Sequence, residues 1–157
     1  MRIIGIDPGT GILGFGIIES KNGKVQLVDG GVIRTPVKED DAVRLLTIYE
    51  ELTDIIASTK PDEMAVEKLF FSQNVTTAMT VAQARGVVLL TAMQADLKIS
   101  EYTPQQIKQA LTGYGRADKK QIQEMVRIML GLKEVPKPDD CADAIAAAIT
   151  HAQTIRA

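Results

Sequence analysis

The stretch Ile3-Ile4-Gly5-Ile6-Asp7-Pro8-Gly9-Thr10, near the start of the chain, decides how the rest is interpreted. Its apolar residues form a short run that stops at Pro8-Gly9, as a buried strand does when it reaches a turn. The ordinary explanation for Asp7 is that it starts this turn. A carboxylate beside a buried strand otherwise needs a cation or a hydrogen-bond donor, so the other acids that the fold brings to it become important.

The composition limits which kinds of protein the chain can be. At 157 residues, 45% of them hydrophobic, it can build one substantial core, and we expect a single domain over residues 1–157. The net charge is −2, so a nucleic-acid partner has to be held by a local basic face. Cys141 and His151 are the only cysteine and histidine, which excludes an internal disulfide and a zinc site of the Cys/His type. A bound metal would need oxygen ligands.

The chain has no signal-peptide pattern, because its N-terminal apolar run is short and is interrupted by Asp7. We expect no apolar stretch long enough to span a bilayer. The sequence therefore predicts a soluble, cytoplasmic protein.

The order of strands and helices predicts an α/β domain with a mixed sheet. Strands over residues 3–6, 11–18 and 24–35, with Asn22-Gly23 as a hairpin turn, make a three-stranded antiparallel meander. Further strands are expected over residues 64–71 and 97–102, and helices over residues 42–56, 75–95, 104–111, 118–130 and 139–154. The helix over 75–95 is apolar on more than one face, which suits either a partner subunit or burial within one subunit.

Four carboxylates are candidates for one site. Asp7 ends a strand, Glu67 interrupts an apolar strand, and Asp140 and Asp143 project from one side of the last helix. Capping of that helix by Asp139 or Asp140 would explain one of these acids. Clustered carboxylates repel one another unless a divalent metal binds them. Mg²⁺ and Mn²⁺ prefer oxygen ligands, and two such ions are a known means of hydrolysing phosphodiesters.

Five segments, taken together, resemble a known family. They are Gly5-Ile6-Asp7-Pro8-Gly9-Thr10, Ala65-Val66-Glu67 with Leu69-Phe70, Ala82-Gln83-Ala84-Arg85-Gly86-Val87, Gln106-Ile107-Lys108-Gln109 with Lys119-Lys120, and Asp140-Cys141-Ala142-Asp143-Ala144 with Thr150-His151. In order and spacing they are similar to the bacterial RuvC Holliday junction resolvases over essentially the whole chain. The first segment alone is also found in other ribonuclease H-like proteins and in actin-like and sugar-kinase ATPases. The ordered set is specific.

This resemblance implies a ribonuclease H-like fold, with a central mixed five-stranded sheet of three antiparallel strands followed by parallel strands, flanked by helices. It implies a homodimer that resolves four-way DNA junctions in recombination and repair by paired, symmetrical nicks, leaving 5′-phosphate ends that can be ligated. The implied cofactor is Mg²⁺, two ions per subunit, with Mn²⁺ able to substitute. The implied partner is a branch-migration motor of the RuvA–RuvB type.

The resemblance also assigns roles to residues. Asp7, Glu67, Asp140 and Asp143 match the family's metal-binding and catalytic acids, although some members have histidine where Asp140 stands. The matching or nearby DNA-binding positions are Phe70, Arg85, Lys108, Arg116, Lys119 and Lys120. Phe70 matches an aromatic that stacks on bases, and helical Gly86 is expected to permit a close approach. Without the resemblance, a lysine on a helix surface is simply solvated.

The chain stops at Ala157 without the basic C-terminal extension of some members. We therefore expect strongly salt-sensitive binding through a narrow basic groove, with affinity that depends on Arg85, Lys108, Arg116, Lys119, Lys120 and Arg127.

Three other functions are alternatives. An actin-like or kinase-type ATPase shares the first segment, but it needs two related domains and a second glycine-rich phosphate loop. A catalytically silent DNA-binding dimer gains nothing from acids that face phosphate. Another ribonuclease H-like nuclease, such as one that processes RNA, is the nearest alternative among enzymes.

Overall fold

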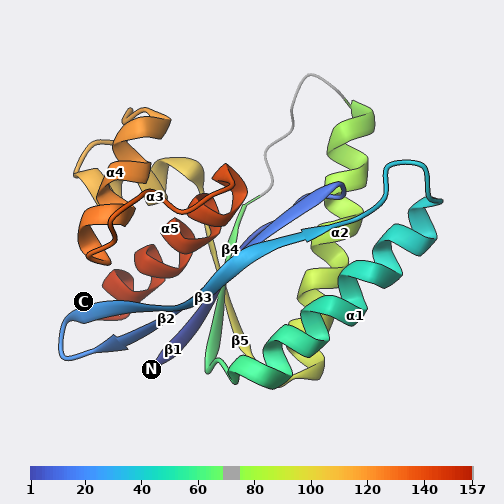
Figure 1. Cartoon of the computed structure of the whole chain (residues 1–157), viewed down its shortest axis with the longest axis horizontal. Helices are drawn as coiled ribbons and strands as arrows, with labels where there is room; N and C mark the ends of the chain where they lie inside the picture. Colours follow the sequence, from blue (N-terminus) through green and yellow to red (C-terminus); the bar gives the residue numbers. More distant parts are fainter. Residues whose placement is uncertain (69–74, 157) are drawn as a thin grey trace.

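The computed structural model of the chain describes residues 1–68 and 75–156. Its centre is a five-stranded sheet with the strand order β3-β2-β1-β4-β5 (Figure 1). The strands are β1 Arg2–Asp7, β2 Ile12–Lys21, β3 Lys24–Arg34, β4 Glu63–Glu67 and β5 Lys98–Tyr102. β1, β2 and β3 pair antiparallel, whereas β4 runs parallel to β1 and β5 parallel to β4. The predicted mixed sheet is confirmed.

Helices cover both faces of this sheet (Figure 1). α1 Asp41–Thr59 and α2 Val75–Gln94 lie on one face, and α3 Pro104–Thr112, α4 Lys119–Met129 and α5 Asp139–Thr154 lie on the other. Side chains alternate along β1, so Ile4 and Ile6 join the core under α1 and α2, while Ile3 joins the core under α5. Asp7, at the end of β1, continues the series that faces α5.

Local sequence features set several ends of these elements. Asn22 and Gly23 have φ values of 51° and 84°, as a two-residue hairpin turn between β2 and β3 requires. Thr103 caps α3 in a capping box, with Pro104 in the first turn, and Asp118 caps α4 in the same way. The strand predicted over 64–71 ends at Glu67, and Phe70 lies outside the described residues.

Within residues 1–68 and 75–156, α2 is covered on one side only. Ala84 and Val88 are buried, whereas large apolar side chains on the helix are exposed, namely Val75, Met79, Leu90 and Met93. Complete burial within one subunit is therefore not the explanation for its apolar sequence. We expected no apolar stretch long enough to span a bilayer. This expectation is wrong, because α2 is long enough and apolar enough to cross a membrane. A single helix of this kind is weak evidence for a membrane span, since core helices of soluble proteins pass the same test.

Glycines allow α5 to lie directly against β1 and β2. A Cβ at Gly5 would come within 1.9 Å of the Ala144 carbonyl oxygen, and a Cβ at Gly14 within 2.0 Å of the Asp140 carbonyl oxygen. Side chains do not tolerate such distances, so glycine is needed at both positions. The helix that carries Asp140 is thereby held close to the strand that carries Asp7.

Candidate active site

Asp7 and Glu67 lie side by side where two parallel strands end. They are the last residues of β1 and β4, and the register pairs Ile6 with Val66 immediately before them. The two carboxyl groups share a hydrogen bond. Because parallel neighbours end at the same edge of a sheet, the apolar run before each acid is what brings the two acids together.

α5 brings two further carboxylates to the same place. Asp140 lies in its first turn and Asp143 follows on the helix, and the charges of both act on Asp7. The predicted capping role of these acids is wrong. The N-cap is Pro138, without a side-chain capping bond, and Asp139 and Asp140 lie inside the first turn. Their charges still face the positive end of the helix dipole.

Burial and mutual repulsion raise the pKa of these carboxyl groups. Burial, followed by the charges of Glu67 and the two α5 aspartates, raises the pKa of Asp7 to about 8. Burial and then the charge of Asp143 raise the pKa of Glu67, while Lys108 and Lys119 act in the opposite direction. Burial also raises the pKa of Asp143. The raised pKa values of Asp7 and Glu67 both favour a proton shared between these two residues when no cation is bound.

The donor set fits a divalent cation bound through oxygen. All four candidate ligands are carboxylates, which suit Mg²⁺ or Mn²⁺. Within residues 1–68 and 75–156, no group of three His, Cys, Asp or Glu side chains is arranged closely enough to hold an ion. The carboxylates thus perturb one another without closing around one point. A cation would relieve the repulsion that raises their pKa and would displace the proton on Asp7.

Two lysines lie beside these acids. A cavity of about 250 Å³ is lined by Glu67, Asp143, Lys108 and Lys119, among others. Lys119 Nζ lies 3.0 Å from Asp139 Oδ2, and this contact raises the pKa of Lys119 and lowers that of Asp139. Both lysines line the cavity beside Glu67 and Asp143, so they lie next to the candidate acids, as the resemblance implies.

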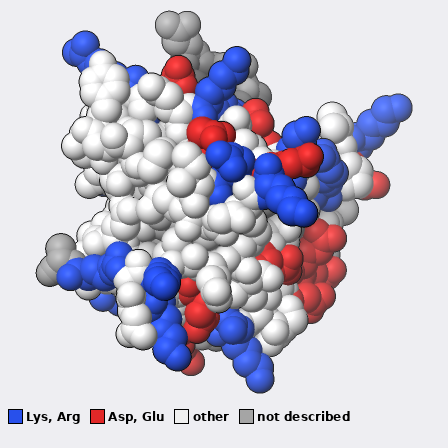
Figure 2. All heavy atoms as spheres, turned by 60° about the vertical axis from the view of Figure 1, so that its left-hand side comes forward, with Lys and Arg blue, Asp and Glu red and all other residues white. Residues whose placement is uncertain are grey.

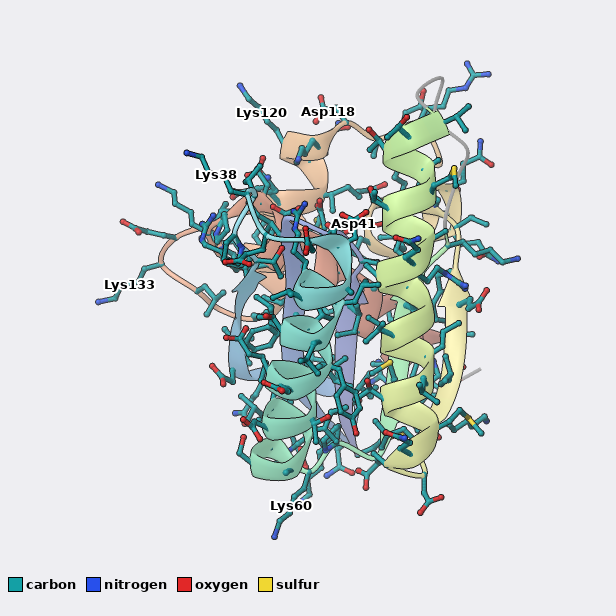
Figure 3. All side chains as sticks on the ribbon, turned by 90° about the vertical axis from the view of Figure 1, so that its right-hand side faces the viewer. Lys38, Asp41, Lys60, Asp118, Lys120 and Lys133 are labelled. Atoms are coloured by element: carbon teal, nitrogen blue, oxygen red, sulfur yellow. The ribbon has the colours of Figure 1, made fainter. Side chains whose placement is uncertain are left out.

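The other predicted DNA-binding residues are more dispersed. Lys120 lines a groove together with Glu124, and Figure 3 places it at the opposite end of the molecule from Lys60. Arg116 lines a different groove, beside Gln109 of α3. On the face in Figure 2, a broad uncharged area lies between basic side chains at its upper and lower edges. Contact of these residues with DNA stays a prediction.

Arg85 lies nearer to the acids. It lines a cavity of about 210 Å³ together with Asp7, Glu67 and Lys68, and it forms an ion pair with Glu101 of β5. Sequence reasoning did not single out Glu101. Its signal was the same one that identified Glu67, an acid within a predicted strand.

His151, although part of the fifth segment, has a structural role in this arrangement. Its ring is 1% exposed, with Nδ1 2.6 Å from Tyr102 Oη and Nε2 2.5 Å from Glu63 Oε2. A neutral ring satisfies both contacts if Tyr102 donates to Nδ1 and Nε2–H donates to Glu63. These bonds tie α5 to β4 and β5.

Comparisons with known proteins give a consistent result. The family model described as crossover junction endodeoxyribonuclease RuvC matches residues 3–151. The RuvC of Heliobacterium modesticaldum is 54% identical, over 99% of this chain and 96% of that protein. The RuvC of Desulfitobacterium hafniense (strain DSM 10664 / DCB-2) is 56% identical, over 99% of this chain and 94% of that protein. The structure of Thermus thermophilus RuvC in complex with a Holliday junction substrate matches with a TM-score of 0.95 and 39% identity, over 99% and 95% of the two chains.

Proposed function

Since the chain belongs to the RuvC family of crossover junction endodeoxyribonucleases, we propose that Asp7, Glu67, Asp140 and Asp143 form the site at which it cuts DNA. The protein resolves Holliday junctions as a DNA-cleaving hydrolase of recombination and repair, and its fold is ribonuclease H-like. The convergence of four carboxylates from β1, β4 and α5 is the observation that supports this assignment. Membership of this family explains the four carboxylates without an ATPase or RNA-processing function.

The endonucleases of this family depend on a metal, and we propose that this chain uses Mg²⁺, with two ions per subunit and Mn²⁺ as a substitute. Bound ions would activate a water molecule and would neutralise the charge on the leaving oxygen. Hydrolysis of this kind would leave 5′-phosphate ends that can be ligated. The chain's own contribution is to hold four carboxylates on three rigid elements and to release the proton of Asp7. Lys108 and Lys119, on the other side of Glu67, would position the phosphate.

The number of ions can be tested by titrating junction cleavage with Mg²⁺ under single-turnover conditions. We expect a sigmoidal dependence with a Hill coefficient approaching about 2, because both ions are needed for the same step. Chelator should abolish cleavage. A hyperbolic dependence with a coefficient of 1 would contradict the assignment of two ions.

We expect Lys108→Ala to reduce the cleavage rate by about 10- to 100-fold, because it removes a cation from the phosphate-binding side of the site. The melting temperature should stay unchanged. The matched control is Lys24→Ala, at the start of β3, whose turn lies at the opposite end of β1 from Asp7. Equal cleavage rates for the two variants would remove Lys108 from the site.

A homodimer is the assembly that α2 favours. The exposed Met79, Leu90 and Met93 recur at helical spacing with Gly86 on the same side of α2. A Cβ at Gly86 would meet nothing within 4 Å among the described residues, so the close approach expected for this glycine does not occur within the chain. A second copy of α2 would cover the apolar row and make use of the glycine. Two subunits would then supply the two sites that paired nicks require.

Replacing Leu90, which is 55% exposed, by Glu should convert the dimer to a monomer at concentrations where the unmodified protein is dimeric. Sedimentation velocity measures this change. We expect the variant to lose paired nicking of the junction, because each strand would be cut independently. Val43→Glu places the same charge on an exposed apolar position of α1 and should stay dimeric. A dimeric Leu90→Glu variant would exclude α2 as the interface.

We also propose that the protein acts in the cytoplasm, where a branch-migration motor of the RuvA–RuvB type delivers junctions to it. Membership of the family supports both proposals.

A further inference from the structure

Arg85 lines the same cavity as Asp7 and Glu67, yet its charge is paired elsewhere. Its guanidinium forms an ion pair with Glu101 of β5. Arg85 is therefore a cation at the edge of the site whose ion pair is with Glu101 of β5 and not with a carboxylate proposed to bind metal.

The ion pair with Glu101 leaves the hydrogen-bonding groups of Arg85 only partly satisfied. The side chain is only 19% exposed, and its Nε atom is buried without a hydrogen-bond partner in the described part of the chain. A guanidinium offers five donors in a planar fork, which suits two oxygens of one acceptor group. A buried donor without a partner costs free energy, so a ligand that offered a second acceptor would be favoured over the resting state.

Glu101 is a partner that can be exchanged. It is 34% exposed on its side chain, so water competes with the ion pair and weakens it. Its own negative charge also opposes the approach of any anion to this part of the cavity. Lys68, which lines the same cavity, adds a second cation. A phosphate entering between Lys68 and Arg85 would meet both cations beside Asp7.

We propose that Arg85 binds a backbone phosphate of the strand to be cut, and that Glu101 holds the guanidinium in place until DNA displaces it. The proposal rests on the proposed function, because it takes the junction as the ligand. Glu101 then lowers the affinity of the protein for DNA. It limits binding of DNA that does not deliver a phosphate deep into the site, so it is a specificity-determining residue.

The test measures binding of a labelled four-way junction, without metal so that no DNA is cut, over a series of salt concentrations. The variants are Glu101→Gln, Arg85→Gln and the double variant. The control is Glu19→Gln, which frees Arg2 from an ion pair at the opposite end of β1 and changes the net charge equally. Arg85→Met, which keeps an unbranched apolar side chain and removes the charge, replaces Arg85→Gln if that variant does not fold.

We expect Glu101→Gln to bind the junction about 3- to 10-fold more tightly than the unmodified protein, and Glu19→Gln to bind it equally. Arg85→Gln should weaken binding and reduce the slope of log affinity against log salt by about 0.9, the value of one phosphate contact. The gain from Glu101→Gln should disappear when Arg85 is also replaced.

A Glu101→Gln variant no tighter than Glu19→Gln would overturn the proposal, as would a gain that persists without Arg85. If the unmodified protein bound the junction no better than a linear duplex, the proposed function itself would fail first. The binding measured for the unmodified protein therefore distinguishes failure of the proposed function from failure of the Arg85–Glu101 proposal.

Discussion

Asp7→Asn is expected to lower the rate of junction cleavage by at least about 10³-fold while leaving junction binding intact. The asparagine keeps the shape of the aspartate and can donate a hydrogen bond to Glu67, so the arrangement at the ends of β1 and β4 should persist. It cannot supply the negative charge that a divalent cation needs. Single-turnover cleavage and a gel-shift titration measure the two quantities separately.

The same variant should be more stable than the unmodified protein in the absence of metal. The pKa of Asp7 is raised from 3.8 to about 8, so the folded state binds more protons than the unfolded state between these values. Stability is therefore lost as pH rises through this range, and removing the carboxylate removes the loss. We expect a gain of about 2 kcal/mol or more at pH 8, roughly 4 °C or more in melting temperature, and a smaller gain at pH 5.

The control for both measurements is Asp54→Asn, an exposed aspartate of α1, which should change neither cleavage nor stability. An Asp7→Asn variant that cuts normally would show that Asp7 does not hold the metal. A variant that cuts poorly and is also less stable would show that Asp7 supports the fold and is not strained by its neighbours.

Gly14→Ala should disturb the site from a position that carries no chemistry. Gly14 pairs with Asp7 across β1 and β2, and its Cβ would come within 2.0 Å of the Asp140 carbonyl oxygen and 2.4 Å of the carbonyl carbon. The obstacle is helix backbone, so α5 must move away from the sheet. We expect a loss of about 1–3 kcal/mol in the free energy of unfolding, and a fall of about 10²-fold in cleavage, because Asp140 and Asp143 move with the helix.

Gly115→Ala is the matched control, since the nearest atom to its Cβ would be Gln109 Oε1 at 3.8 Å, an ordinary contact. It should melt and cut like the unmodified protein. If Gly14→Ala also melted and cut like the unmodified protein, the position of Asp140 would not depend on the close packing of α5 against β2.

Much of the fold could be predicted because its signals are local. The run that ends at Asp7, the Asn22-Gly23 turn and Pro104 at the start of α3 each set a strand end, a turn or a helix start within a few residues. The capping boxes of Thr103 and Asp118 were not predicted. The exposure of one side of α2 could not be predicted. A helix that is apolar on two sides suits burial in one chain and burial between two chains equally well.

The site was predictable in its acids and less so in its cations. Glu67 stood out because an acid in an apolar strand needs a reason, and the parallel pairing of β4 with β1 then places it beside Asp7. Pairings between distant residues leave no local signal, so the contact of Lys119 with Asp139 and that of Arg85 with Glu101 emerged only from the fold. The proposed stacking by Phe70 lies outside the described residues.

The most direct test of the central claim is cleavage of a labelled four-way junction beside a linear duplex of the same sequence, with Mg²⁺ and with chelator. The assigned site predicts paired, symmetrical nicks in the junction alone, and only when Mg²⁺ is present. Equal cutting of both substrates would keep the chemistry and contradict the junction-resolving role. Cleavage that continues in chelator would contradict the metal site formed by Asp7, Glu67, Asp140 and Asp143.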